Sequence, residues 1–333
     1  MLGSAAIIEV LVLADFTTIK CIERPLASLA IASLVLVFQA QPLDAKPLPS
    51  ELAKKERAVR LSPSTGWQLE VLDDRCRLAR KFTSSNGPGL AMFEQLAPGN
   101  TFDLTIAGPD TARSRRGAWF YAGMRSDLEM KTIDPLEYGL AGFESSLTLS
   151  GVRIDDQKQS SQERKETVAA EIDAANAERM DRIVLQRSTT IISYGTGNMK
   201  APLEALNACS KELLSIWKLD AGAHQSYRPA EMPGEGAYFS RLHHNLVNTR
   251  GNAGHESILR VRALIGKDGS VTDCFHEYVF SSGGAEPDVC KEIRPMQFSP
   301  ATNQSGEPIA SFYSKSYFLS QFDPWQADAH GER

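Results

Sequence analysis

Three histidines lie close together in the last third of the sequence, at His243, His244 and His255. Imidazole is a common zinc ligand, and a zinc site needs three or four ligands that converge on one ion. Neighbouring residues on a helix, such as His243 and His244, point about 100° apart and do not easily face the same ion. The spacing therefore favours surface or helix-capping histidines, and we predict no metal site.

Other residues suited to chemistry are also poorly arranged for it. The Gly-Thr-Gly segment 195–197 precedes a helical pattern, where an anion could bind, but it lacks the Lys and the remaining glycines of a phosphate-binding loop. Asp73 and Asp74 are adjacent in a strand or turn, so their side chains diverge. The serines at 281–282 lack the Gly-x-Ser-x-Gly context of a hydrolase nucleophile. We therefore predict no catalytic residue, no cofactor and no enzyme activity.

The chain contains five cysteines, and no two of them form a Cys-x-x-Cys pair. This spacing gives no sign of a redox motif or a zinc knuckle. Cys21 lies within the N-terminal segment that export would remove. The remaining four make an even number, which is consistent with two disulfides in an oxidising compartment; they are Cys76, Cys209, Cys274 and Cys290.

The N-terminal segment 1–45 predicts export. Residues 26–40 carry no charge, the basic residues Lys20 and Arg24 precede them, and small residues follow. This order is typical of a secretory signal peptide, and the run is shorter than the about 20 apolar residues that a membrane span needs. Because residues 1–19 are also largely apolar, an uncleaved N-terminal anchor, or neither, remains open. We expect a periplasmic protein that contacts the membrane only if this segment is not cleaved.

The length of 333 residues suggests two domains. The composition is that of a folded protein, with 42% hydrophobic and 23% charged residues. The net charge of −5 argues against general binding of nucleic acid, because no excess of basic residues exists to neutralise phosphates. We therefore expect no nucleic-acid partner.

After a predicted linker at 46–62, the sequence shows the alternation of half-buried strands. Apolar and polar residues alternate from Trp67 to Val71 and again within 102–106. Turn signals rich in Gly and Pro separate such runs. This pattern predicts an antiparallel sheet, a sandwich or a small barrel over about 63–155.

The N-terminal β-rich domain, predicted at 63–225, continues with helical patterns. Residues 156–182 are charged and rich in alanine, which favours a solvated linker helix over a coiled coil because no a/d heptad is sustained. Another strand is predicted at 183–194. Leucines at helical spacing then predict an amphipathic helix at 199–218.

Cys209 lies near the middle of the predicted helix 199–218. Outside the C-terminal region, Cys76 is the partner left for it. A bridge between the two would attach the helix to the β-rich domain, which would explain why a helix so far along the chain belongs there. The alternative is that both are buried free thiols.

The C-terminal region 238–322 has a denser pattern of elements and is followed by a tail at 323–333. It begins with a short helix, followed by a strand at 258–266 and a hairpin turn of the Asp-Gly type. A return strand, a helix at 286–293 and a final strand at 309–319 complete it. The order helix, β-hairpin, helix, strand predicts a small α+β domain.

This region also carries short motifs in a fixed order. They are the strand 258–266, Asp268-Gly269, Val271, Ser281-Ser282-Gly283, the helix around Val289, Phe298-Ser299-Pro300-Ala301 and Gly306-Glu307-Pro308-Ile309. In these motifs the sequence resembles the TonB C-terminal domain family of energy transducers. The resemblance implies a periplasmic binding module rather than an enzyme. It implies that a short segment of an outer-membrane transporter is bound as an extra strand on an exposed sheet edge.

The last strand would be that edge. Alternation would point Tyr313, Lys315 and Tyr317 to one face and Phe312 to the other. We predict these four as the partner-binding residues. The alternative is that the aromatic residues are simply core and ordinary surface.

The resemblance also bears on the last two cysteines. In such a fold the hairpin packs against the helix that follows it, so a bridge between Cys274 and Cys290 is geometrically reasonable. Closing a loop of this size stabilises a domain by about 3 kcal/mol in the chain-entropy model.

The sequence departs from the family in its N-terminal part. Energy transducers carry a membrane anchor and a long Pro-rich spacer, whereas a charged helix and a separate β-rich domain occupy that space here. We therefore expect a periplasmic protein that uses a TonB-like domain to contact a protein partner, rather than a direct force transducer. The alternative is a secreted or periplasmic hydrolase or ligand-binding protein with its site in the N-terminal β-rich domain.

Overall fold

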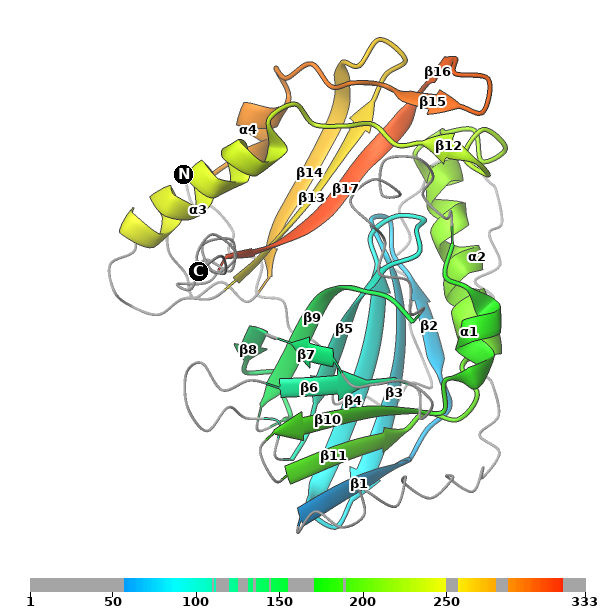
Figure 1. The fold of residues 1–333 in the computed structure, drawn as a ribbon, viewed down its shortest axis with the longest axis vertical. Helices are drawn as coiled ribbons and strands as arrows, with labels where there is room; N and C mark the ends of the chain where they lie inside the picture. Colours follow the sequence, from blue (N-terminus) through cyan, green and yellow to red (C-terminus); the bar gives the residue numbers. More distant parts are fainter. Residues whose placement is uncertain are drawn as a thin grey trace, which may run out of the picture.

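The computed structural model describes residues 57–109, 111, 120–124, 131–133, 136–143, 145–154, 171–187, 190–249, 257–279 and 287–319. The predicted segment 1–45, most of the linker 46–62, the first part of the predicted helix 156–182 and the tail 323–333 lie outside these residues. The fold is mixed α+β, with one large curled β-sheet and few helices (Figure 1). Figure 1 shows the large sheet at the bottom, a three-stranded sheet at the top and helix α2 (Lys200–Ile216) along one side.

The large sheet forms the β-domain, residues 57–217, together with α1 and α2. Its strands are β1 (Arg57–Pro63), β2 (Gln68–Val71), β3 (Cys76–Ser84), β4 (Gly87–Gln95), β5 (Phe102–Ala107), β6 (Phe120–Gly123), β7 (Lys131–Ile133), β8 (Leu136–Tyr138), β9 (Ser146–Val152), β10 (Arg182–Arg187) and β11 (Thr190–Gly195). The order is β7-β6-β10-β11-β1-β3-β4-β5-β9-β8, with β2 also paired to β3. Because β7 and β8 end this order but only residues 134–135 separate them in the chain, they lie within about 11 Å, and the sheet must curl.

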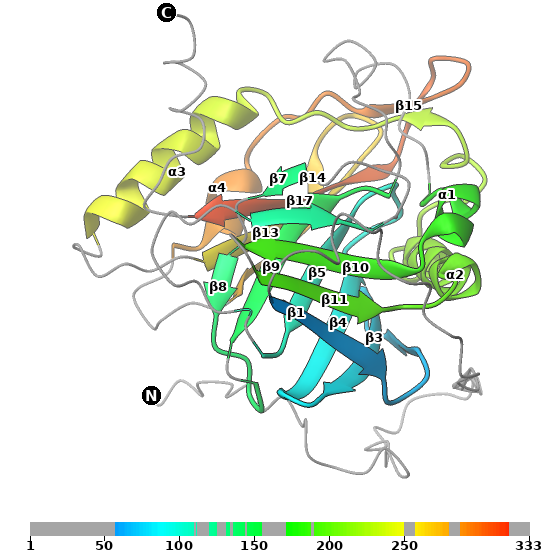
Figure 2. The same cartoon turned by 60° about the horizontal axis from the view of Figure 1, so that its bottom comes forward.

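The prediction of a linker at 46–62 is wrong for residues 57–62, which belong to β1. Val59 and Leu61 are buried and alternate with exposed residues, which is the period of a half-buried strand. β1 pairs in parallel with β11 and antiparallel with β3, and Figure 2 shows it beside β11. The expectation of a purely antiparallel sheet is therefore corrected, because strands far apart in the chain are free to pair in either direction.

The single strand predicted at 183–194 is in fact the antiparallel pair β10 and β11. Each strand contributes buried apolar residues, such as Leu185 in β10 and Ile192 in β11, which pair with each other. Polar residues at the end of β10 and the start of β11 separate the two apolar runs. The hairpin brings β11 alongside β1.

Within the described residues, the predicted helix 156–182 is reduced to α1, Ala174–Arg179. The Asp173 side chain caps α1 by accepting two backbone N–H groups of the first turn. Met180 has an extended backbone, and β10 begins two residues later, so the helix cannot continue. Helix α2 agrees closely with the prediction at 199–218, and its buried apolar residues include Leu203, Leu206, Leu213 and Leu214. None of the described helices is long and apolar enough to span a membrane.

The C-terminal domain, residues 227–319, contains α3 (Glu235–Thr249), β13 (Ser257–Ile265), β14 (Val271–Val279), α4 (Val289–Ile293) and β17 (Ser311–Leu319). The three long strands form an antiparallel sheet in the order β14-β13-β17. A small sheet joins β12 (Tyr227–Arg228), β15 (Ala301–Asn303) and β16 (Pro308–Ile309). Because β12 belongs to this small sheet, the domain begins before residue 238, the boundary that the sequence predicted.

The Asp-Gly turn between β13 and β14 requires glycine at Gly269. Its φ is +83°, in the left-handed region that side chains disfavour. A Cβ at this position would also lie 2.2 Å from the carbonyl oxygen of Phe298. The close approach lets the backbone N–H of Phe298 donate to the Gly269 carbonyl at 2.9 Å, which joins the hairpin to the segment after α4.

Both faces of the three-stranded sheet are covered. On one face, Tyr317 of β17 stacks on Phe239 of α3, and a disulfide links β14 to α4. On the other face, Arg260 of β13 forms an ion pair with Glu94 of β4. The sheet therefore lies between its own helices and the β-domain, and β17 takes part in both contacts.

Candidate functional site

β17 is an edge strand in the part of the chain that the structure describes. It pairs with β13 along its length, from Ser311 opposite Ile265 to Leu319 opposite Ser257, and with no other described strand. Its second edge therefore carries main-chain N–H and C=O groups without a strand partner among the described residues. An edge of nine residues is long enough to accept an added strand.

Three of the four predicted partner-binding residues lie on the face of β17 that α3 covers. Tyr313 is buried, and its hydroxyl and that of Tyr317 hydrogen-bond each other. The Tyr317 hydroxyl also donates to Glu235, at the start of α3, at 2.9 Å. Lys315 is exposed and forms an ion pair with the same carboxylate. These contacts hold α3 against β17.

The two tyrosines on this face act as neutral hydrogen-bonding groups. Burial raises the pKa of both phenols, and the Glu235 carboxylate raises the pKa values further. The hydroxyl groups of Tyr313 and Tyr317 therefore stay protonated at neutral pH and have no role as bases.

Phe312 points to the opposite face and is buried. Its ring packs edge-on against Trp217 at the end of α2 and stacks on His224. The Nδ1 of His224 donates to the Asp220 carbonyl at 2.7 Å, so Nε2 accepts from the Ser311 hydroxyl at 2.9 Å when the ring is neutral. Burial lowers the pKa of His224, which keeps the ring in this neutral form.

The four predicted partner-binding side chains therefore differ in how far they are buried. Phe312 and Tyr313 belong to the core, Tyr317 is half-buried and Lys315 is exposed. A partner at this edge would meet the main chain of β17 and the Lys315 side chain, not a row of exposed aromatic rings.

The other face of the three-stranded sheet meets the β-domain through buried charges. Arg260 of β13 lies 2.8 Å from Glu94 of β4 and 3.3 Å from Asp103 of β5, and these side chains are 3%, 4% and 6% exposed. Glu277 of β14 lies 3.6 Å from Arg260 and 2.7 Å from Arg75 of the β-domain. Arg75, Glu94, Asp103, Arg260 and Glu277 form the interdomain charge cluster.

Glu94 stays ionised at neutral pH in this cluster. Burial alone would raise the pKa of Glu94, but the guanidinium groups of Arg260 and Arg77 lower it to about 2. Both carboxylate oxygens are engaged, because Oε2 accepts from Arg260 and Oε1 accepts from Arg77. A carboxylate without a free oxygen and with so low a pKa is not suited to acid–base chemistry at neutral pH.

We predict that Glu94 makes the protein less stable in acid. Its pKa of about 2 in the folded state lies below the ordinary value of 4.5, so between these values the unfolded chain binds the proton more readily. The contribution of Glu94, about 3 kcal/mol, is present above about pH 5 and is lost as the pH falls toward 2. Urea denaturation at pH 7 and pH 3 should show a larger acid loss for the wild type than for Glu94→Gln. Equal losses in the two proteins would contradict this assignment.

Asp103 connects the β-domain to β17. The register between β5 and β9 shifts between Phe102 and Leu104, and such an irregularity re-aims the side chains near it. The Oδ1 atom of Asp103 accepts from Ser150 of β9 at 2.6 Å, and Oδ2 accepts from Ser316 of β17 at 3.0 Å. The end of β9 and the middle of β17 are therefore linked through one carboxylate.

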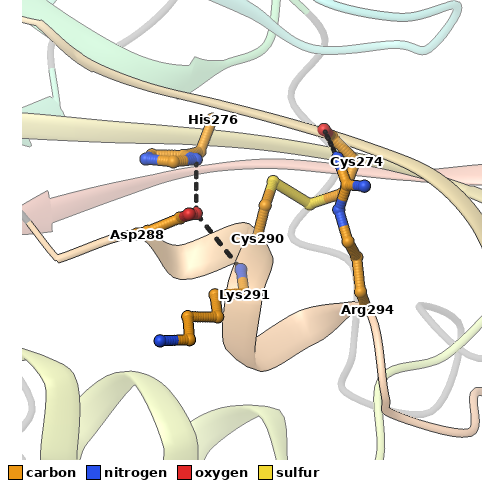
Figure 3. Close-up of a disulfide and its surroundings, with 6 residues drawn as sticks. All are labelled: Cys274, His276, Asp288, Cys290, Lys291 and Arg294. Atoms are coloured by element: carbon orange, nitrogen blue, oxygen red, sulfur yellow. Dashed lines mark hydrogen bonds and ion pairs between the residues drawn. A yellow bond between two sulfur atoms is a disulfide. The ribbon is translucent and has the colours of Figure 1, made fainter.

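Figure 3 shows the disulfide between Cys274 of β14 and Cys290 of α4, whose Cα atoms lie 5.6 Å apart. Arg294 donates from Nη2 to the carbonyl oxygen of Cys274 at 3.3 Å. Asp288 accepts a backbone N–H of α4 and lies 3.8 Å from Nδ1 of His276. These contacts attach α4 to the hairpin, and neither sulfur is a free thiol that could act as a nucleophile.

The second disulfide joins Cys76 of β3 to Cys209 of α2, with the Cα atoms 6.0 Å apart. The two bonds are the pairs that the sequence favours, and the alternative of free thiols at Cys76 and Cys209 does not hold in this structure. Two disulfides in one chain hint at an oxidising compartment.

The other residues considered for chemistry do not come together. Asp74 forms an ion pair with the next residue in the chain. His243 and His244 lie on α3, whereas His255 and the serines at 281–282 fall outside the described residues. Over the ranges that the structure describes, no group of three or more His, Cys, Asp or Glu residues could hold a metal ion.

Sequence reasoning missed the interdomain charge cluster. Glu94, Asp103 and Arg260 each sit in a strand where alternation marks polar positions as solvent-facing. The one available signal was that charges recur on the same side of strands in both domains, and this signal is common on any surface.

The fold and this geometry define a mixed α+β protein in which a small sheet with an edge strand packs on a larger curled sheet. Comparison with known proteins finds no matching family model, no matching curated protein and no matching solved structure.

Proposed function

We propose that this is an interaction protein whose C-terminal domain binds an extended segment of a protein partner by strand addition to β17. The observation that carries the proposal is that β17, a nine-residue strand, is hydrogen-bonded to β13 alone among the described strands. Unpaired strand edges are templates for a further strand, and binding modules use them for this purpose.

The chemistry of the region agrees with binding rather than catalysis. The acidic residues Glu94 and Asp103 are neutralised by Arg260, and the tyrosines on β17 are held protonated. An added strand would be bound through main-chain hydrogen bonds, with Lys315 as the exposed side chain beside it. A segment with an acidic residue opposite Lys315 would be favoured, because cross-strand charge pairs are stabilising.

The partner class that we propose is a periplasm-facing segment of an outer-membrane transporter. The resemblance of the C-terminal motifs to the TonB C-terminal domain family supports this choice, and the two disulfides agree with an oxidising compartment. The β-domain between the N-terminal segment and the C-terminal domain favours a periplasmic adaptor over a force transducer.

Proline substitutions in β17 test strand addition. The N–H groups of adjacent residues in a strand point to opposite sides, so of Ser314 and Lys315 one donates toward β13 and the other toward the outer edge. We expect Ser314→Pro and Lys315→Pro to differ in stability. The variant that loses the N–H directed toward β13 should melt at a lower temperature, and the variant that loses the outward N–H should keep the wild-type melting temperature. This stable variant should bind transporter peptides about tenfold more weakly than the wild type, because the partner loses one hydrogen bond.

The measurement is fluorescence anisotropy with synthetic peptides copied from periplasm-facing segments of outer-membrane transporters of a Gram-negative host. The alanine variant at the same position, Ser314→Ala or Lys315→Ala, is the matched control, because it removes the side chain and keeps the N–H. Strand addition is wrong if the stable proline variant binds the same peptides as tightly as its alanine control does, or if no peptide binds the wild type.

A further inference from the structure

β17 contacts the β-domain at two places along its length. Phe312, near the start of the strand, packs on Trp217 of α2, whereas Ser316, four residues later, donates to Asp103 of β5. Cα atoms of β17 and β9 approach within 8 Å of each other, which is closer than the about 10 Å between stacked sheets. Ser150 of β9 and Ser316 of β17 both donate to the Asp103 carboxylate, so the end of β9 lies close to β17 at Ser316. Figure 1 shows the two sheets facing each other.

The contact at this end contains buried charged side chains. Arg260, Glu94 and Asp103 are almost fully buried between the domains. The Nε atom of Arg260 is buried without a hydrogen-bond partner among the described residues. Water would satisfy this group if the interface opened, so separation here costs less than separation of an apolar interface of the same size. Polar interfaces between domains of one chain commonly permit relative motion.

The two ends of the interface differ in character. Around Phe312 the contact is aromatic, with Trp217, His224 and Tyr227 packed together. About 13 Å along β17, at Ser316, the contact is ionic and hydrogen-bonded. An opening motion would therefore pivot at the aromatic end and separate the charged end.

We propose that the β-domain regulates access to β17: the interdomain charge cluster keeps the two domains docked, and its opening frees the edge beside Ser316 for a partner strand. This inference rests on the proposed function of β17, since it names what controls that site. The docked arrangement is the closed state, and the added strand stabilises the open state by mass action because it binds only there.

Two sets of variants test the regulation in the full chain. The pair Asp103→Cys with Ser316→Cys, joined directly or by a short thiol-reactive crosslinker, locks the closed state at positions whose side chains hydrogen-bond in the structure. Ser316→Ala and Asp103→Asn weaken the closed state without deleting a core side chain. Each single cysteine variant is the control for the locked pair.

Hydrogen exchange of β17 reports docking without a partner, and anisotropy with the transporter peptides reports binding. We expect β17 to exchange at least about tenfold faster in Ser316→Ala and Asp103→Asn than in the wild type, and peptide binding to tighten by a similar factor. We expect the locked pair to bind at least about tenfold more weakly than either single cysteine variant.

The outcomes separate the regulation from the function on which it rests. Equal peptide binding by the locked pair and its controls would overturn the regulation and leave strand addition supported. Unchanged exchange in Ser316→Ala and Asp103→Asn would also overturn it, because the cluster would then not hold the domains together. Faster exchange in these variants, with no peptide bound by any of them, would overturn strand addition and the regulation together.

Discussion

Replacing both Cys76 and Cys209 by alanine is expected to lower the free energy of unfolding by about 5 kcal/mol. The disulfide joins residues 133 positions apart, and the entropy that a cross-link removes from the unfolded chain grows with the logarithm of the loop. The bond also attaches α2 to β3, so its loss should loosen the helix that carries Trp217 and thereby the aromatic end of the interdomain contact.

Replacing both Cys274 and Cys290 by alanine gives the internal comparison. Its loop is much shorter, with a separation of 16 residues, and the same relation gives a loss of about 3 kcal/mol. Guanidinium denaturation of the two double-alanine variants, followed by far-UV circular dichroism, measures both losses. A larger loss for the short loop than for the long one would show that native contacts of the α4 disulfide outweigh chain entropy.

Arg260→Met is expected to lower the free energy of unfolding by about 3 to 5 kcal/mol. Methionine fills much of the same volume, but it leaves Glu94 and Asp103 buried without their shared cation. Removing one partner of a buried ion pair costs far more than the pair contributes, because the remaining charge keeps its desolvation penalty. The loss should be largest near neutral pH, where the Glu94 carboxylate is ionised.

The control for this substitution is Arg77→Met, which removes a second guanidinium that contacts Glu94. Arg77 is 29% exposed, so water replaces part of the lost interaction and a loss of about 1 kcal/mol is expected. Adding Glu94→Gln to Arg260→Met should recover part of the large loss, since one of the two uncompensated carboxylates is removed. No recovery in that double variant would show that Arg260 acts mainly through its packing.

Elements fixed by residues close in the chain were predictable from the sequence. Leucine spacing placed α2 to within two residues at each end, and the Asp-Gly pair placed the turn between β13 and β14. In both cases the deciding interactions lie within one turn or one hairpin, so the local pattern contains them.

Most features fixed by distant contacts were not predictable, although the Cys76–Cys209 pair was favoured from the sequence. The segment 57–62 looks like a linker until β11 and β3 are beside it, because its short alternation is no stronger than that of many loops. Arg260 and Ser316 fall on the polar side of their strands, and alternation alone assigns such residues to solvent. The same ambiguity applies to Phe312, whose burial depends on α2 and on the loop that carries His224.

The place of β1 in the large sheet affects how the protein acquires its structure. β1 lies between β11 and β3. Its parallel partner is β11, Thr190–Gly195, so β1 cannot complete its pairing until that distant segment has been brought beside it. Pairing across such a separation is slow, because the closure entropy is lost before the contacts form. Cys76 and Cys209 are likewise far apart in the chain, with a separation of 133 residues. We therefore expect oxidation before the sheet assembles to permit mispairing of Cys76, so the Cys76–Cys209 bond should form after the sheet rather than direct its assembly.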